Sequence, residues 1–138
     1  MTYLLDTNVI SELSRRKPAV TVVDWFQNAP YQSLHLSVLT AGELRSGVER
    51  LPDGSRKEQL RQWLEQDVPT WFGERLLPVS DEVADRWGRL VAESRRSLPA
   101  IDSLLAATAL QHGLRLVTRN LTDFRFAGLS VINPWGRE

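Results

Sequence analysis

Short apolar runs that alternate with helix-like segments are the feature that most restricts what this chain can fold into. The runs have strand character and occur at residues 2–5, 34–37, 75–79, 114–118 and 131–132. Helical periodicity and capping residues mark the segments between them, at residues 8–14, 18–28, 38–50, 55–67, 80–95 and 99–112. This alternation predicts an α/β fold with a mostly parallel central β-sheet flanked by α-helices.

Length and composition favour one globular domain across residues 1–138. A chain of 138 residues with 42% hydrophobic and 25% charged residues has the composition of an ordinary folded domain. The formal net charge of +0 excludes a uniformly basic nucleic-acid-binding surface, and the absence of cysteine excludes disulfides and thiolate metal sites. The N-terminus has no basic segment followed by a long apolar run, so we expect a cytoplasmic protein without a membrane span.

Four acidic residues are predicted to meet at the carboxyl edge of this sheet. Asp6 directly follows the first strand, and Asp123 lies in the loop after the fourth. Glu43 lies in the helix that follows the second strand, and Asp102 lies in the first turn of the helix that begins near Pro99. Parallel sheets bind ligands beyond the carboxyl ends of their strands, so these side chains are candidates for a single site.

Carboxylates gathered in one pocket repel one another. At a separation of about 4 Å and an effective dielectric constant near 20, each pair costs roughly 4 kcal/mol. Shared protons or bound cations relieve that repulsion. Mg²⁺ and Mn²⁺ prefer oxygen ligands, whereas zinc usually takes Cys or His, and this chain has no Cys and only 2 His. The pattern therefore favours one or two divalent ions and phosphodiester cleavage.

Each carboxylate also has a purely structural explanation. Asp6 is suited to cap the helix that follows it, and Thr40 with Glu43 fits a capping box. Asp102 suits the positive end of a helix dipole, and Asp123 suits an Asx turn. The placement of all four at one predicted edge is the argument for a functional site.

Four segments resemble the motifs of PIN-domain proteins, especially the VapC- and FitB-type toxins of bacterial toxin–antitoxin pairs. In chain order they are Leu-Leu-Asp-Thr-Asn-Val-Ile-Ser-Glu-Leu at 4–13, Ser-Val-Leu-Thr-Ala-Gly-Glu-Leu at 37–44, Pro-Ala-Ile-Asp-Ser-Leu-Leu-Ala-Ala at 99–107 and Val-Thr-Arg-Asn-Leu-Thr-Asp-Phe at 117–124. The resemblance extends over residues 3–134, and it implies a single PIN-like domain.

The resemblance implies a Mg²⁺- or Mn²⁺-dependent endoribonuclease that a cognate antitoxin inhibits. It assigns Asp6, Glu43, Asp102 and Asp123 to the catalytic site, with Asp6 and Asp102 as the metal ligands. Glu43 and Asp123 would then orient the attacking water. No histidine is needed as a general base.

The segment after the fourth strand supplies further candidates. The resemblance assigns Thr118 and Asn120 to supporting the acidic site or orienting the substrate. Arg119 adjoins both, and it is our first choice among the arginines near the motifs for contact with RNA. The other arginines considered are Arg45, Arg50, Arg95 and Arg96.

Apolar residues on the predicted helices between about residues 20 and 71 predict protein partners. They exceed what a small core needs, so we expect an exposed patch and a homodimer; they are Trp25, Phe26, Leu60, Trp63 and Leu64. The resemblance adds an antitoxin whose tail blocks the acidic cleft through a basic side chain. Promoter DNA would be bound only through that antitoxin.

Three other functions fit part of this pattern. A phosphatase with an aspartyl nucleophile also has an Asp after its first strand, but it needs a second Asp two positions later, where this chain has Asn8. A binding protein with a vestigial pocket would have lost a site carboxylate, and all four are present. A housekeeping PIN nuclease of RNA processing stays open. A neighbouring gene for a small DNA-binding protein would favour the toxin.

Overall fold

The computed structural model describes residues 1–136 as one α/β domain built on a five-stranded sheet. The strands are β1 (Tyr3–Leu5), β2 (Leu34–Ser37), β3 (Leu76–Leu77), β4 (Arg115–Val117) and β5 (Val131–Ile132). All neighbouring strands are parallel, in the order β3-β2-β1-β4-β5. The predicted parallel sheet is confirmed, and the first strand of the chain is its central one.

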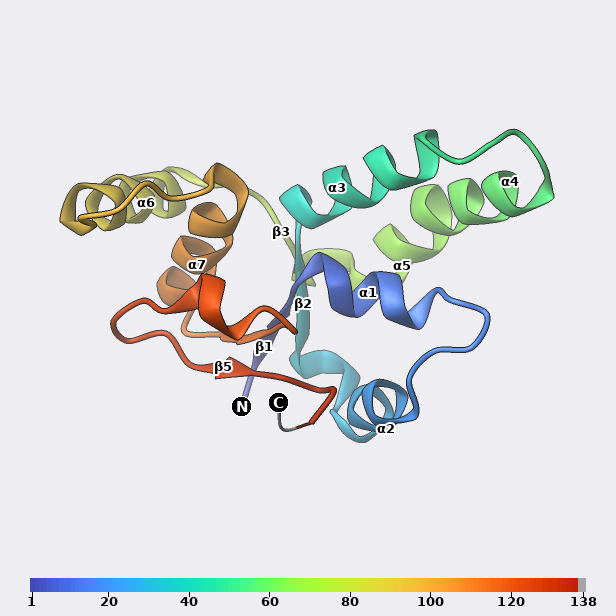
Figure 1. Ribbon diagram of the computed structural model, residues 1–138, viewed down its shortest axis with the longest axis horizontal. Helices are drawn as coiled ribbons and strands as arrows, with labels where there is room; N and C mark the ends of the chain where they lie inside the picture. The colour runs from blue at the N-terminus through green and yellow to red at the C-terminus, as the bar shows by residue number, and fades with distance from the viewer. Residues whose placement is uncertain (137–138) are drawn as a thin grey trace.

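Helices connect the strands and flank the sheet (Figure 1). They are α1 (Thr7–Leu13), α2 (Val20–Asn28), α3 (Val38–Glu49), α4 (Ser55–Gln62), α5 (Val68–Phe72), α6 (Asp81–Glu93) and α7 (Ala100–His112). Shorter turns are the 3₁₀ segments η1 (Tyr31–Ser33), η3 (Gly73–Arg75) and η4 (Leu121–Phe124) and the π-helical η2 (Trp63–Asp67). Within residues 1–136, none of the helices combines the length and the apolar character that crossing a bilayer requires.

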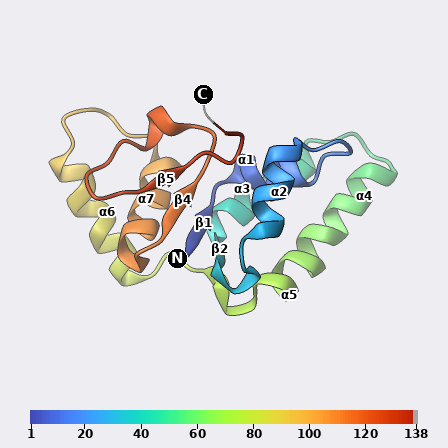
Figure 2. The same cartoon turned by 90° about the horizontal axis from the view of Figure 1, so that it is seen from below.

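Each face of the sheet has a hydrophobic core of its own, because successive strand residues point to opposite faces. Leu5 and Val117 pack into the cluster formed with α1, α2, α3 and α5. Their neighbours Leu4 and Leu116 pack into the cluster formed with α7. Figure 2 shows the two groups of helices on opposite sides of the sheet. The strands are therefore covered on both faces, and their ends are the places left for a functional site.

The region after α4 departs from the prediction. The helix expected over residues 55–67 continues to Phe72, through the π-helical turn η2 and past Pro69. A proline ring inside a helix crowds the carbonyl four residues earlier, here that of Glu65. The wider turn η2 ends at Asp67, two residues before Pro69, and it includes Glu65, so it opens the backbone where that clash would occur.

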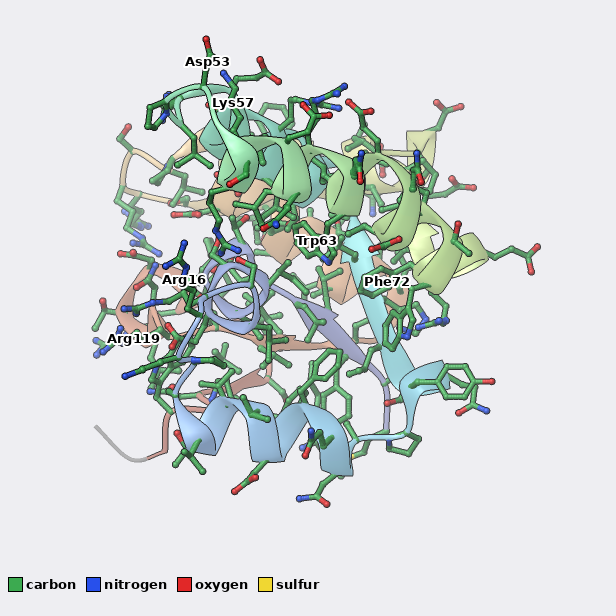
Figure 3. The ribbon with its side chains drawn as sticks, turned by 90° about the vertical axis from the view of Figure 1, so that its right-hand side faces the viewer. Arg16, Asp53, Lys57, Trp63, Phe72 and Arg119 are labelled. Carbon is green, nitrogen blue, oxygen red and sulfur yellow. The ribbon has the colours of Figure 1, made fainter. Side chains whose placement is uncertain are left out.

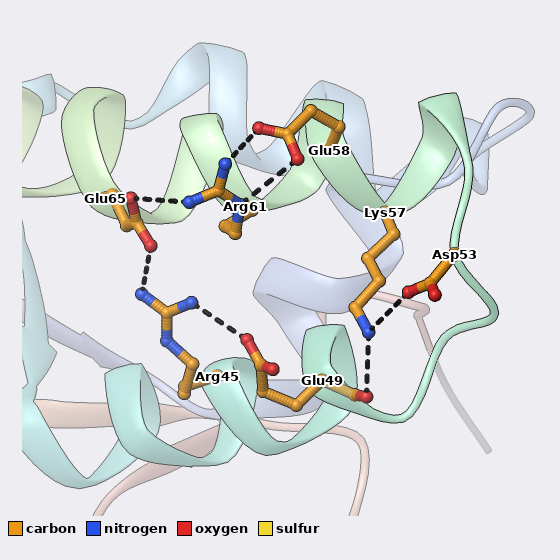
Figure 4. A network of polar contacts seen from close by, with 7 residues as sticks. All are labelled: Arg45, Glu49, Asp53, Lys57, Glu58, Arg61 and Glu65. Carbon is orange, nitrogen blue, oxygen red and sulfur yellow. Dashed lines mark hydrogen bonds and ion pairs between the residues drawn. The ribbon is translucent and has the colours of Figure 1, made fainter.

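A network of charged side chains holds α3 beside α4 and η2 (Figure 4). Arg45 on α3 contacts Glu49 at 3.1 Å and Glu65 at 2.7 Å. Arg61 contacts Glu65 at 3.6 Å and also pairs with Glu58. Exposed pairs of this kind contribute at most about 1 kcal/mol each. Arg45, one of the arginines considered for RNA contact, is thus committed to α3 and its neighbours.

Candidate active site

Asp6 connects the end of the central strand to the start of α1, and it is only 5% exposed. Its backbone N–H donates to the carbonyl of Val117 at 2.9 Å. Its Oδ1 accepts the backbone N–H of Thr7 at 2.7 Å, so the capping role considered from the sequence is confirmed. Its Oδ2 accepts the hydroxyl of Thr118 at 2.7 Å. The cap therefore uses one carboxylate oxygen, and the other is held at the end of β4.

Asn8 and Thr118 link the ends of β1 and β4. Asn8 Nδ2 donates to Thr118 Oγ1 at 3.2 Å and lies 3.4 Å from Asp6 Oδ2. Asn8 Oδ1 accepts the backbone N–H of Arg119 at 3.3 Å, and the backbone N–H of Asn120 donates to Thr118 Oγ1 at 3.0 Å. These bonds fix the carboxylate of Asp6 in one orientation.

Glu43 lies on α3, well inside the helix. Ser37 is the N-cap of α3, and its Oγ accepts the backbone N–H of Leu39 at 3.0 Å. Glu43 is past the first turn counted from that cap, so the capping box considered for Thr40 and Glu43 is wrong. The hydroxyl of Thr7 donates to Glu43 Oε1, which brings this exposed carboxylate to the first turn of α1, next to Asp6.

Asp102 lies in the first turn of α7, where a contact from α6 fixes the backbone. The indole N–H of Trp87 donates to Ser103 Oγ at 2.9 Å, and Ser103 Oγ donates in turn to the carbonyl of Pro99 at 2.9 Å. Ser103 is buried, whereas Asp102 is partly exposed. The helix that carries Asp102 is thus anchored one residue away from it.

Asp123 lies on the exposed side of η4, the short turn that follows β4. Its backbone N–H donates to the carbonyl of Asn120 at 3.2 Å. The next residue, Phe124, is buried in the cluster formed with α7. The buried ring holds the turn against the sheet, and the charge of Asp123 acts on both Asp6 and Asp102.

The environment of Asp6 raises its pKa above the ordinary value. Burial raises the pKa of Asp6, hydrogen bonds from Thr118 and Thr7 lower it, and the charges of Glu43 and Asp123 raise it again, with a net upward shift. Glu43 and Asp123 belong to α3 and η4, so charges from separate elements act on the end of the central strand.

Asp102 is subject to the same repulsion. Burial raises the pKa of Asp102, and the charges of Asp6, Asp123 and Glu43 raise it further. Within residues 1–136, none of the four carboxylates takes part in an ion pair. The charges of the four carboxylates therefore act on one another, with no ion pair in this part of the chain to offset them.

The oxygen donors of this site suit a hard divalent cation. Over residues 1–136, no three His, Asp or Glu side chains are placed to hold a single metal ion together. Mg²⁺ is often held by one or two carboxylates while water completes its shell, so this placement is compatible with Asp6 and Asp102 as a pair of ligands. Four uncompensated carboxylates would gain stability from such a cation.

Two polar residues of the site were missed by sequence analysis. Thr7 contacts Glu43, and Asn8 contacts both Thr118 and the backbone of Arg119. The sequence feature that could have identified them is their position directly after Asp6, at the end of a strand. Of the supporting residues that were predicted, Thr118 contacts Asp6 through its side chain. Arg119 and Asn120 make their contacts with this region through backbone N–H groups.

An apolar groove of about 590 Å³ lies between α1 and α2 on one side and η2 and α5 on the other. Trp71 is 40% exposed at this groove, and Figure 3 shows Trp63 and Phe72 on its η2–α5 side. Its apolar lining is Ile10, Leu13, Pro18, Val23, Phe26, Trp63, Val68, Trp71 and Phe72. It is the kind of surface that accepts the apolar face of a partner segment.

The expected apolar patch is therefore built differently from the prediction. Leu64 is buried in the core, and Trp25 and Leu60 pack against that core and do not line the groove. Phe26 and Trp63 do line it. The π-helical turn η2 carries Trp63 and Leu64, and helical periodicity alone did not separate their roles.

Known proteins resemble this chain over nearly its whole length. The model of the PIN domain matches residues 3–127. The plasmid stability protein StbB of Pseudomonas syringae pv. tomato is 41% identical over 96% of this chain and 97% of its own. Toxin FitB of Neisseria gonorrhoeae is 38% identical over 96% and 97%, and VapC ribonuclease Y4jK of Sinorhizobium fredii is 37% identical over 96% and 96%.

Solved structures share the fold. The structure of FitAB bound to an IR36 DNA fragment contains a chain that is 36% identical, with a TM-score of 0.89, covering 99% of this chain and 98% of that one. A toxin–antitoxin complex from Klebsiella pneumoniae contains a chain that is 26% identical, with a TM-score of 0.69, covering 96% and 98%. The likeness therefore includes the whole sheet and the segments that carry the acidic residues.

Proposed function

Because the chain belongs to the PIN-domain family, we propose that it is an endoribonuclease and the toxin of a type II toxin–antitoxin pair. The observation that carries the enzymatic part is the electrostatic coupling of Asp6, Glu43, Asp102 and Asp123, which come from separate elements at the ends of the strands. Relatives named VapC ribonuclease and Toxin FitB, 37% and 38% identical, support the assignment.

Asp6 and Asp102 are the proposed ligands of Mg²⁺ or Mn²⁺, directly or through water. When bound, the ion would supply an activated water and stabilise the negative charge that develops on the phosphate. Asp6 is suited to this role because Thr118 and Asn8 hold its carboxylate in place. Asp102 is suited because α6 fixes the turn that carries it.

Glu43 and Asp123 are the proposed acceptors for the attacking water. Both are exposed, unlike Asp6, so solvent and an RNA strand have access to them. Their oxygens would orient the water toward phosphorus and accept its proton as the bond from phosphorus to the leaving oxygen breaks. The hydrogen bond from Thr7 would hold Glu43 in the direction of Asp6.

The proposed antitoxin would bind the apolar groove between α1–α2 and η2–α5, and a basic side chain of its tail would enter the acidic site. The exposed indole of Trp71 and the apolar lining support the first contact, and the four coupled carboxylates support the second. We also propose a homodimer in the cytoplasm, and contact with promoter DNA only through the antitoxin. The Klebsiella pneumoniae complex and the DNA-bound FitAB structure are consistent with these partners.

The enzymatic proposal is tested by RNA cleavage with matched charge variants. Glu43→Gln removes one carboxylate of the site, whereas Glu49→Gln removes an exposed carboxylate from the same helix. We expect the parent and Glu49→Gln to cleave RNA with Mg²⁺ or Mn²⁺, EDTA to stop both, and Glu43→Gln to be slower by about a hundredfold or more. Intact RNA in every mixture, or an active Glu43→Gln variant, would contradict the proposal.

The toxin role is tested separately from the nuclease. Expression of the chain alone should stop growth, and co-expression of the neighbouring gene product should restore it. That product should copurify with the chain, and copurification should decrease when Trp71→Ser alters the groove. A nuclease that leaves growth unchanged and trims one RNA precursor would instead be the housekeeping enzyme.

A further inference from the structure

Arg119 stacks on Trp135 beside the acidic site. The guanidinium carbon of Arg119 lies 5.0 Å from the centre of the Trp135 ring. Trp135 is partly buried against the core of α1, α2, α3 and α5, and its backbone N–H donates to Asn133 Oδ1 at 3.0 Å. The core contact holds the ring, the hydrogen bond holds its backbone, and the ring is thus a support for the guanidinium.

The other end of Arg119 is held by the site itself. Its backbone N–H donates to Asn8 Oδ1, and the preceding residue, Thr118, donates its hydroxyl to Asp6. Both contacts sit at the carboxyl ends of β1 and β4. The backbone of Arg119 is therefore anchored at the acidic site, while its side chain is exposed at the edge of the molecule (Figure 3).

Arg119 differs from arginines that already serve the fold. Arg45 and Arg61 pair with glutamates between α3 and α4, and Arg89 pairs with Asp85 along α6. Across residues 1–136, no carboxylate forms an ion pair with Arg119. A guanidinium that lies over an aromatic ring and forms no ion pair has N–H groups available for an anion, and phosphate accepts two such bonds at once.

We propose that Arg119 binds a phosphodiester group of single-stranded RNA next to the one that is cleaved, and that Trp135 is the residue that positions its guanidinium. The inference rests on the proposed ribonuclease function. Four carboxylates exceed the charge of one divalent ion, so the site with its proposed ion still repels a polyanion, and a nearby cation that the fold does not neutralise would favour binding of RNA. RNA is favoured over the antitoxin as the ligand because Arg119 does not line the apolar groove.

The test is the kinetics of a short single-stranded RNA at several salt concentrations. Arg119→Gln should raise KM about tenfold with little change in kcat, because a charged, two-bond contact is lost from binding. The slope of log(kcat/KM) against log[salt] should become shallower by roughly 0.7, the value for one phosphate contact on a single strand. Arg119→Lys should keep the slope and recover part of the affinity, since it restores the charge without the second bond.

Trp135 is tested by removing and then restoring an aromatic face. Trp135→Leu should raise KM about two- to fivefold, the effect of one exposed cation–π contact, and Trp135→Phe should recover most of it. Melting curves identify variants that have lost their fold. In a folded pair of variants, a lower KM in Trp135→Phe than in Trp135→Leu then reports the aromatic contact. Arg89→Gln is the control for charge, because it removes one arginine from the surface of α6 and should change neither KM nor the slope.

The outcomes separate this inference from the proposed function. A parent that cleaves no RNA contradicts the proposed function itself. An active parent whose KM and salt slope are the same in folded Arg119→Gln and Trp135→Leu contradicts only the role of this pair. Weaker inhibition by the antitoxin with an unchanged KM for RNA would also overturn it, because Arg119 would then bind the partner protein.

Discussion

The negative charge of Asp6 raises the pKa of Asp102, and after burial it is the largest cause of that shift. The two residues come from the end of β1 and the first turn of α7, which are far apart in the sequence. Repulsion between two such groups lowers the stability of the metal-free fold, while the same pair would serve catalysis when a cation is bound. That relationship leads to predictions in which stability and activity move in opposite directions.

Asp102→Asn should melt no lower than the parent without metal, and should have lost RNase activity. The amide keeps the shape and removes repulsion, and partial exposure limits the gain to about 1 kcal/mol. With Mn²⁺ the difference in melting temperature between the variant and the parent should shrink or change sign, because only the parent gains the full free energy of metal binding. Melting curves with Mn²⁺ and with EDTA measure this. A residue that served only the helix dipole would give a metal-independent loss of about 0.3–1 kcal/mol and retained activity.

The stability of the metal-free protein should respond to pH through the same two carboxyls. Asp6 and Asp102 both have a pKa raised above the ordinary 3.8, so the folded chain holds their protons more tightly than the unfolded chain. Their contribution is fully present below about pH 3.8 and is lost as the pH rises through the raised values. Glu65, with a lowered pKa, acts in the opposite direction.

The quantity to measure is therefore the difference between two proteins. Thermal unfolding of the parent and of Asp102→Asn, both in EDTA, should diverge in favour of the variant as the pH rises above the ordinary aspartate value. Parallel curves over that range would show that Asp102 carries no excess proton affinity in the folded state.

Thr118→Val should lower both stability and activity. The hydroxyl that donates to Asp6 Oδ2 disappears, and the donors of Asn8 and Asn120 lose their acceptor. Loss of a buried bond to a charged group costs about 2 kcal/mol, and the pKa of Asp6 should rise further. Thr122→Val, an exposed change on η4, is the control and should be neutral. Equal unfolding free energies for the two variants would contradict the role given to Thr118.

The contact between α6 and α7 should matter for catalysis as well as for stability. Trp87→Phe keeps the ring but removes the N–H that Ser103 accepts, at an expected cost of about 1 kcal/mol. We expect kcat to fall several-fold because the turn that carries Asp102 loses an anchor. A double-mutant cycle with Ser103→Ala isolates the bond. Additive effects of the two changes would show that this bond does not stabilise the turn.

The alternation of strands and helices was readable from the sequence because each element carries its own period and its own caps. Ser80 and Gly113, for example, mark a helix start and a helix end by local chemistry, and both do so in the structure. The segment before Pro69 was not readable in this way. A proline usually ends a helix, and the π-helical turn that lets this one continue has no comparable local signature.

The acidic residues of the site were predicted from their places after strands or on the helices of the α/β pattern, but the side chains that support them were not. The contact of Asn8 with Thr118 joins residues that are 110 positions apart, and no periodicity reports such a pair. Similarly, Thr40 and Glu43 fit a capping box until the structure shows that Ser37 is the cap. The stacking of Arg119 on Trp135 depends on where β5 leads the chain, which strand patterns do not specify.

The central position of β1 has a consequence for how this protein is made. Asp6 is synthesised well before the side chain that orients it, because Thr118 follows 112 residues later. The strand that precedes Asp6 likewise lacks its β4 neighbour until residues 115–117 have been translated. A nascent or prematurely terminated chain that ends before β4 thus has the carboxylate without the architecture around it.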